Sequence, residues 1–450
     1  MPYEGEFAGY RSIRRLVEAD AVQQLIKRAR VASPSIDREE PAPNRVPIPS
    51  TETPAFVLGI DGSYSEVPAR NGYPSAHVGY CTVASVLINL KLIDQLDEER
   101  PVDPQIFRQT EDAATIDAAL PGNNVVTRNH TSAHDAFREA VFDVLHDTVV
   151  DEEDRTHLLD TYEALLALKP KAREQLCPYS HKGCDRHLEQ IPAGNTNCPC
   201  GKLNPIYSTD ALRIHERFSH ENTNGEAFGL VTQVWEKLLL VHLLRCFERR
   251  DLLDQLGRLA FVLDGPLGVF GPPAWLSAAI SSELKRINAI FRKKTGTDLL
   301  ILGIEKTGTF VSHFDEIDQT EQLGVPRFEP RSYLLLTDNY IKSRISLSDS
   351  QKRYGEDTYF GRKFFYKSST GGRIVASIPF LTDPQDTLDT DDISLYPQFG
   401  TACALLDKLA SNRFPNAVTP LVSAHAEAAI PLELGRKVLQ QLAKALMRQD

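Results

Sequence analysis

Short apolar runs alternate with longer amphipathic stretches along the chain, and this spacing predicts a mixed α/β fold. Two of the short runs, FVLGIDGS from position 56 and FVLDGPL from position 261, each contain an Asp-Gly pair. Apolar runs of this length that end in turn residues are typical of buried strands. We therefore expect two buried strands, each of which delivers a carboxylate, Asp61 or Asp264, to a sharp turn at the end of a sheet.

The rest of the pattern adds further strands and the helices that would flank them. Helices are expected over 12–30, within 131–175, and over 225–250, 274–293, 400–411 and 423–448. Further strands are expected over 78–89, 299–304, 333–337, 363–367 and 373–380. The last two strands are joined by a Gly-Gly pair that favours a hairpin. Strands at the front, followed by helix–strand alternation, indicate a mixed sheet flanked by helices.

Changes in composition divide the chain into four parts. Residues 1–54 form a helical arm and a proline-rich linker, and residues 55–130 form the first part of a core. Residues 131–224 form a helical insertion that contains a cysteine-rich segment, and residues 225–450 return to the core.

The overall composition bounds the class of protein. The chain has 450 residues, of which 25% are charged and 42% hydrophobic, with a formal net charge of −11. These values are ordinary for a globular protein. No apolar run approaches the length of a membrane span, and the N-terminus lacks a signal-peptide core, so we expect a cytoplasmic protein without a membrane partner. The acidic balance does not exclude a nucleic-acid enzyme, because a basic channel can lie within an acidic protein.

The two Asp-Gly strings are the first candidate site. Two buried carboxylates side by side are costly unless a cation or a proton lies between them. We therefore predict a site for magnesium or manganese at Asp61 and Asp264, of the kind that supports phosphoryl transfer. A third acid is needed, and the 225–250 helix offers Glu226, Glu236 and Glu248, among which the spacing does not decide.

Two further residues are candidates for the same site. His425 lies at the front of the last predicted helix, and Lys306 follows a predicted strand. The lysine could bind a phosphate or neutralise developing charge. A packing or capping histidine and a solvated lysine are the plainer interpretations of these two residues.

A cysteine cluster forms the second candidate site. Four thiols within 24 residues, in a chain expected to be reduced, predict a closed structural zinc site. Their spacing departs from paired Cys-x2-Cys, so His181 and His187 stay open as substitute ligands. The four cysteines are Cys177, Cys184, Cys198 and Cys200.

The order of the strings IDGS, VGY, LDGPL and PLVSAH, which begin at 60, 78, 263 and 420, resembles that of the NurA nucleases. This resemblance implies a ribonuclease-H-like core and a homodimeric, manganese- or magnesium-dependent DNA nuclease. It also implies a HerA-like hexameric translocase ATPase as partner, in DNA end processing or in defence against phage. By resemblance, Asp61 and Asp264 would be metal ligands and His425 the active-site histidine, with Glu226 the first choice for the acid between them. The cysteine-rich insertion is not a general feature of that family.

Two other classes of protein compete with a nuclease. An actin-like nucleotide-binding enzyme would use the Asp-Gly-Ser turn to hold phosphate, but it needs further glycine-rich turns that we do not find. A catalytically silent adaptor would keep the fold and the zinc module without the acidic ligands. Both aspartates are present in this chain.

Overall fold

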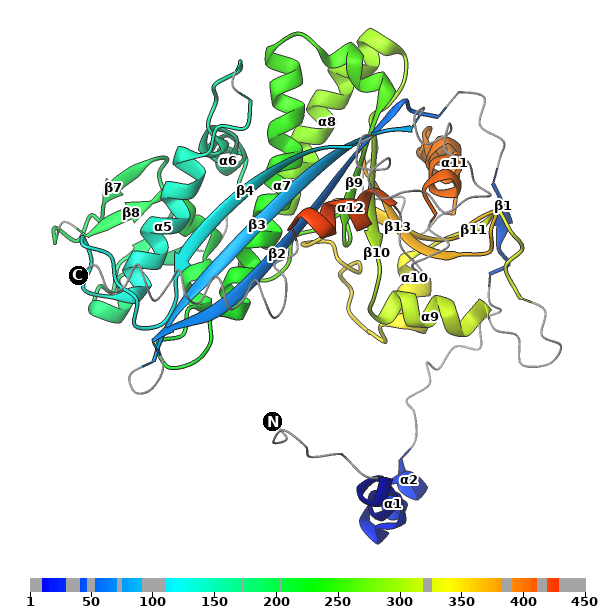
Figure 1. Cartoon of the computed structure of the whole chain (residues 1–450), viewed down its shortest axis with the longest axis horizontal. Coiled ribbons are helices and arrows are strands. Elements are labelled where there is room, and N and C mark those ends of the chain that lie inside the picture. Colours follow the sequence, from blue (N-terminus) through cyan, green and yellow to red (C-terminus); the bar gives the residue numbers. More distant parts are fainter. Residues whose placement is uncertain are drawn as a thin grey trace.

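A nine-stranded mixed sheet is the largest element of this computed structural model (Figure 1). The structure describes residues 10–29, 41–46, 53–70, 75–90, 111–151, 153–170, 174–202, 204–318, 326–381, 391–410 and 419–428. Within those residues the strand order is β1-β11-β12-β13-β10-β9-β2-β3-β4. The strands are β1 (Asn44–Arg45), β2 (Phe56–Arg70), β3 (Ala76–Asn89), β4 (Glu111–Pro121), β9 (Leu259–Asp264), β10 (Leu300–Glu305), β11 (Ser332–Leu335), β12 (Gly361–Lys367) and β13 (Arg373–Pro379).

Strands β2, β9 and β10 run parallel to one another at the centre of this sheet, and the other pairs are antiparallel. Ile60 of β2 pairs with Leu263 of β9, and Asp264 pairs with Ile304 of β10. This register places Asp61 beside Asp264, as the two apolar runs predicted.

Helices cover both faces of the sheet. On β9, Phe261 and Leu263 belong to one hydrophobic cluster, whereas Ala260 and Val262 belong to another. Because successive side chains of a strand point to opposite faces, the two clusters lie on opposite sides of the sheet. The first cluster includes α5 (Ala133–Asp147), α6 (Leu158–Ala167), α7 (Gly225–Arg249) and α8 (Leu276–Thr295), and the second includes α11 (Phe399–Leu409) and Ala424 of α12 (Thr419–Ala428).

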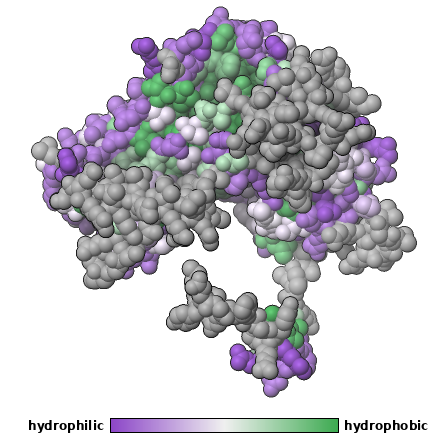
Figure 2. All heavy atoms as spheres, viewed as in Figure 1, coloured by the Kyte–Doolittle hydropathy of each residue, from purple (hydrophilic) through white to green (hydrophobic). Residues whose placement is uncertain are grey.

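Helix α7 is the central helix of the first layer. It is the one helix among the described residues that is long and apolar enough to cross a membrane. In the structure 78% of its apolar window is buried inside the protein, which is typical of a core helix. On the face seen in Figure 2, hydrophobic residues gather towards the centre and hydrophilic residues lie along the margins.

The predicted turn at Asp61 is wrong. Strand β2 does not end at the Asp-Gly pair but continues to Arg70, paired with β3 throughout. What ends near Asp61 is the pairing with β9, whose last register pair is Ile60 with Leu263. The turn predicted after Asp264 is confirmed, since β9 ends there and Gly265 takes a φ of 74°. Glycine tolerates this left-handed conformation at no steric cost.

Most of the other predicted elements are confirmed within a few residues. The helix expected over 12–30 is instead two helices, α1 (Tyr10–Glu18) and α2 (Asp20–Arg28). Strand β4 and helix α9 (Thr309–Asp318) were not predicted. The final helix is present as α12, and the rest of the predicted range, 429–448, lies outside the described residues, as does most of the proline-rich linker.

The cysteine-rich segment forms a small module beside α5. It contains two short hairpins, β5 (Gln175–Leu176) with β6 (His187–Leu188), and β7 (Asn195–Asn197) with β8 (Pro205–Tyr207). Arg138 of α5 anchors the segment that follows β8, because its Nε and Nη2 atoms donate to the Asp210 carboxylate at 2.7 and 2.6 Å. Both side chains of this pair are buried.

Candidate metal centre

The carboxyl ends of the central parallel strands bring together four of the residues singled out in the sequence. Asp61 lies on β2, Asp264 ends β9, Lys306 follows β10, and His425 lies on α12. The Lys306 ammonium lies between the two carboxylates, 3.2 Å from Asp264 Oδ1 and 3.7 Å from Asp61 Oδ2. The site therefore contains one cation close to two acidic groups.

Asp61 lies in an electrostatically unfavourable position for a charged carboxylate. Its side chain is 2% exposed, and burial, followed by the negative charge of Asp264, raises its pKa to about 8. Lys306 acts in the opposite direction and lowers the pKa, while Glu236 adds to the rise. A carboxyl group in such a position ionises readily only when further positive charge approaches it. This is the electrostatic environment that a divalent cation would relieve.

His425 is positioned by Asp61. Its Nδ1 atom lies 3.0 Å from Asp61 Oδ2, while 60% of its side chain is exposed. When Asp61 is ionised it can only accept, so Nδ1 donates its proton and Nε2 is left with a free lone pair. The exposed part of the imidazole can then exchange a proton with a substrate.

Glu236 is the acid that the structure adds to this site. It is buried on α7 beside Gly62, whose backbone N–H donates to Asp61 Oδ1 at 2.8 Å. Burial, and to a lesser extent the charge of Asp264, raise its pKa, while Lys237 opposes the rise by donating at 2.8 Å. Gly62 permits this approach, because a Cβ atom there would lie 2.6 Å from Glu236 Oε1.

The structure does not bring Glu226 or Glu248 to the site. Glu226 was the first choice from the resemblance, but its Oε1 lies 3.4 Å from Arg217 Nε and its side chain is 66% exposed. Glu248 pairs instead with Arg286 of α8. Ten residues separate Glu226 from Glu236, and at 1.5 Å per residue this is roughly 15 Å along the helix. Helical spacing alone could not reveal this, because it does not show which part of α7 lies against Asp61.

The sequence did contain a signal for Glu236. It stands with Lys237 inside the apolar run from Val231 to Leu244, where a solvated charge is not expected. Charged residues are almost never fully buried unless they are paired or perform a function. A buried acid on a core helix was therefore a better candidate than one near the helix start.

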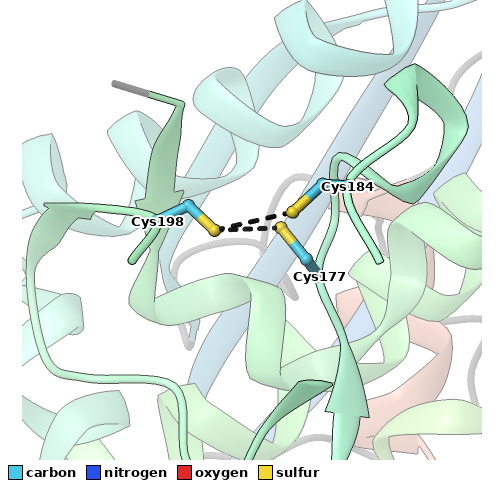
Figure 3. Close-up of side chains that lie close together, drawn as sticks. All are labelled: Cys177, Cys184 and Cys198. Carbon is cyan, nitrogen blue, oxygen red and sulfur yellow. Dashed lines mark hydrogen bonds between the residues drawn. The ribbon is translucent and has the colours of Figure 1, made fainter. Parts of the chain in front are cut away.

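The cysteines of the second candidate site lie together (Figure 3). Cys198 Sγ is 3.5 Å from Cys177 Sγ and 3.8 Å from Cys184 Sγ, and the three sulfurs point toward one another. Four sulfurs around a tetrahedral zinc ion, at bonds of about 2.3 Å, lie roughly 3.8 Å apart. These three thiols form one group, with all of their sulfurs within 4.8 Å of one another, whereas the Cys200 thiol lies outside this group and accepts from Asn204 Nδ2 at 3.7 Å.

The two histidines left open as zinc ligands are directed elsewhere. His187 lies on β6 with its Nδ1 atom 3.9 Å from Glu174. His181 faces Asp135 of α5, at 3.8 Å, and burial lowers its pKa. Burial raises the pKa of Cys177 to about 12, so a metal ion would have to displace the proton of this thiol.

The fold and the carboxylate cluster together define an α/β protein with a candidate divalent-cation site at the ends of its parallel strands. A family model described as the NurA domain matches residues 57–430. This range covers most of the chain and both candidate sites, so the chain belongs to the NurA family.

Two solved structures are similar to the chain at low identity. The crystal structure of the NurA nuclease from Sulfolobus solfataricus is 10% identical, with a TM-score of 0.35, over 98% of this chain and 94% of that chain. A second crystal structure, of NurA, is 11% identical, with a TM-score of 0.28, over 89% of this chain and 90% of that chain. A comparison with curated proteins gives no match.

Proposed function

We propose that this protein is a metal-dependent deoxyribonuclease of the NurA type, with a ribonuclease-H-like arrangement of its core. One observation carries the proposal. Asp61 and Asp264 lie together with Lys306 and His425, and the buried Glu236 acts on both aspartates. A silent adaptor has no need to hold three acidic groups in this costly arrangement.

Asp61, Asp264 and Glu236 would hold manganese or magnesium, because hard divalent cations prefer carboxylate oxygens. When bound, the cation supplies charge stabilisation and an activated water for phosphodiester hydrolysis. The raised pKa values of Asp61 and Glu236 fit this role, since both groups gain from a nearby cation.

The other two residues act on the substrate. His425 donates Nδ1–H to Asp61, so its Nε2 accepts the proton of the attacking water or returns one to the leaving oxygen. Lys306 offers its ammonium group to the negative charge that grows on the phosphate in the transition state. Hydrolysis thereby breaks one P–O bond while water supplies the new oxygen and both protons.

The test compares glutamates on the same helix. In full-length purified protein, we expect Asp264→Asn and Glu236→Gln each to reduce manganese-dependent cleavage of linear DNA at least 100-fold. Glu226→Gln is the matched control, because it changes the same side chain at a solvent-exposed position of α7. We expect this variant to retain full activity.

Manganese binding, measured by calorimetry, distinguishes a variant that has lost the metal site from one that has lost its fold. Undiminished cleavage by Glu236→Gln, together with loss of cleavage by Glu226→Gln, would restore the assignment made from the resemblance. Undiminished cleavage by Asp264→Asn would remove the proposal altogether.

We further propose that the nuclease acts on DNA as a homodimer and together with a HerA-like hexameric ATPase. Membership in the NurA family supports this proposal. Co-expression of the two proteins, followed by size-exclusion chromatography with light scattering, would detect a complex whose mass exceeds that of the hexamer. Migration of the two proteins as separate species at micromolar concentration would contradict it. We place this activity in the cytoplasm, in DNA end processing or antiviral defence.

We also propose that the cysteine cluster holds a structural zinc ion. The spacing of three sulfurs, those of Cys177, Cys184 and Cys198, supports this proposal, and Cys200 would supply the fourth ligand, which leaves no open position for catalysis. Elemental analysis of native protein should find zinc, and Cys184→Ser should lower the zinc content and the melting temperature. Native protein without zinc would exclude the site.

A further inference from the structure

A second group of potential metal ligands lies between the cysteine-rich module and α5. His134 and Asp135 stand in the first turn of α5, and His181 lies in the short helix η1 (Ser180–Lys182), between two of the clustered cysteines. One ligand atom from each of the three residues lies within 4.8 Å of the others. None of these residues takes part in the proposed nuclease centre.

The geometry centres on one oxygen atom of Asp135. Its Oδ1 lies 3.4 Å from His134 Nδ1 and 3.8 Å from His181 Nε2. Ligand atoms around a tetrahedral zinc ion, with bonds of about 2.1 Å, lie roughly 3.4 Å apart. The two distances from Oδ1 are close to this spacing, and the two nitrogens lie within 4.8 Å of each other.

The orientation of His181 is fixed by a backbone contact. Its Nδ1 lies 3.0 Å from the carbonyl oxygen of Pro178, which can only accept, so Nδ1 carries the proton. In the neutral imidazole Nε2 then presents a lone pair toward Asp135 Oδ1. Two acceptors that face each other repel unless a cation lies between them. A histidine whose other nitrogen donates to a carbonyl is also the usual arrangement of a metal ligand.

Two cationic side chains, Lys182 and Arg138, already contact Asp135. Lys182 pairs with Oδ2, so Oδ1, which has a hydrogen-bond contact with His134 Nδ1 at 3.4 Å, is the oxygen that would bind a metal in place of the His134 proton. Arg138 Nη1 lies 3.3 Å from Oδ1, but the two short hydrogen bonds of this arginine to Asp210 hold it in place without Asp135. Arg138 can therefore give up its contact with Asp135 and stay paired.

The surroundings are unusually rich in imidazole. The ring of His220 lies 5.9 Å from that of His134 and 6.5 Å from that of His181, and the ring of His215 lies 5.6 Å from that of His134. Each of these histidines carries imidazole nitrogens of the type that zinc prefers as ligands. His220 or water is available for the fourth position.

We propose that His134, Asp135 and His181 bind a second zinc ion, separate from the cysteine cluster. This ion joins the loop that carries two of the clustered cysteines to the start of α5, and thus ties the module to the helical layer. The proposal does not depend on the proposed nuclease activity.

The test counts metal ions and identifies their ligands in full-length protein. An Asp61→Asn, Asp264→Asn background keeps metal away from the carboxylate site. In this background we expect two zinc ions per chain by elemental analysis. After cobalt substitution we expect both thiolate-to-cobalt absorption in the near ultraviolet and visible bands from a nitrogen–oxygen site.

His181→Gln should reduce the content to one ion per chain and leave the thiolate absorption unchanged. Its side chain is 29% exposed, so the fold should tolerate the change, and the retained thiolate band reports that the module is intact. His187→Gln is the matched control, with an exposed histidine of the same module, and should keep two ions. One ion per chain before mutation, or two ions in His181→Gln, would overturn the proposal.

Discussion

The raised pKa of Asp61 predicts that the metal-free protein gains stability when this residue loses its charge. The usual pKa of the group is 3.8, and in the folded protein burial and Asp264 raise it to about 8. Between these values the native state binds more protons than the unfolded chain, so the stability of metal-free protein falls as the pH rises through this window. Asp61→Asn removes this dependence while keeping a side chain of similar size.

The size of the effect follows from the same shift. At pH 8 the solution lies roughly four units above the unfolded pKa, and at about 1.4 kcal/mol per unit the penalty is at most ~6 kcal/mol. The asparagine also loses the Lys306 ion pair, which offsets part of the gain. We expect Asp61→Asn to raise the free energy of unfolding by about 1–3 kcal/mol at pH 8, and by clearly less at pH 5.

The assay is urea unfolding with EDTA at pH 5 and pH 8, repeated with manganese at pH 8. Wild-type protein should gain stability from manganese according to its affinity, whereas Asp61→Asn should gain little. Asp349→Asn, at an exposed position, is the control, and its free energy of unfolding should equal that of wild type under all three conditions. An Asp61→Asn variant that is less stable than wild type at pH 8, or whose difference from wild type is equal at both pH values, would refute the reasoning.

Three further substitutions test individual contacts. Gly62→Ala should displace Glu236, because the new Cβ would lie 2.6 Å from Glu236 Oε1. The affinity for manganese, measured by calorimetry, should therefore fall at least tenfold, and an unchanged affinity would argue against Glu236 as a ligand. Lys306→Met should lower the rate of cleavage 10- to 1000-fold with manganese binding retained, and an equal loss of both would assign the lysine to the fold instead. Lys363→Met removes a buried lysine and leaves Glu305, whose side chain is 11% exposed, without its partner. This should cost about 3 kcal/mol in urea unfolding, part of which the additional change Glu305→Gln should restore; no recovery would place the loss in packing.

The sequence predicted the central strands and helices because their apolar patterns are strong. The runs that begin at positions 56 and 261 were predicted as buried strands because they are continuously apolar, as expected where both faces of the sheet are covered, and α7 and α8 are long and periodic. Strand β4 was missed because it is an edge strand with mostly exposed side chains, so it lacks that apolar signal.

The end of β2 could not be predicted from local sequence. Asp-Gly is a common turn dipeptide, and nothing next to it indicates that β3 continues to pair with β2 as far as Arg70. Gly62 is instead needed for the close approach of α7. The same residue type therefore serves a packing contact here and a positive-φ turn at Gly265, and only the tertiary structure distinguishes them.

The position of the site follows from how β2 and α7 lie side by side. Tyr64 packs against the first turns of α7 at Gly225 and Gly229, and the Glu66 carboxylate accepts the Asn224 N–H at 2.9 Å. Further along the helix Glu236 meets Gly62, so strand and helix run in opposite directions.

Four strand residues from Gly62 to Glu66 span roughly 13 Å, and twelve helix residues from Glu236 back to Asn224 span roughly 18 Å. The start of α7 thus fixes the extension of β2 beyond β9, and the middle of the same helix supplies the acid beside Asp61. A glutamate near the start of α7, such as Glu226, is held at the far end of this contact, which is why Glu236 rather than Glu226 belongs with the two aspartates.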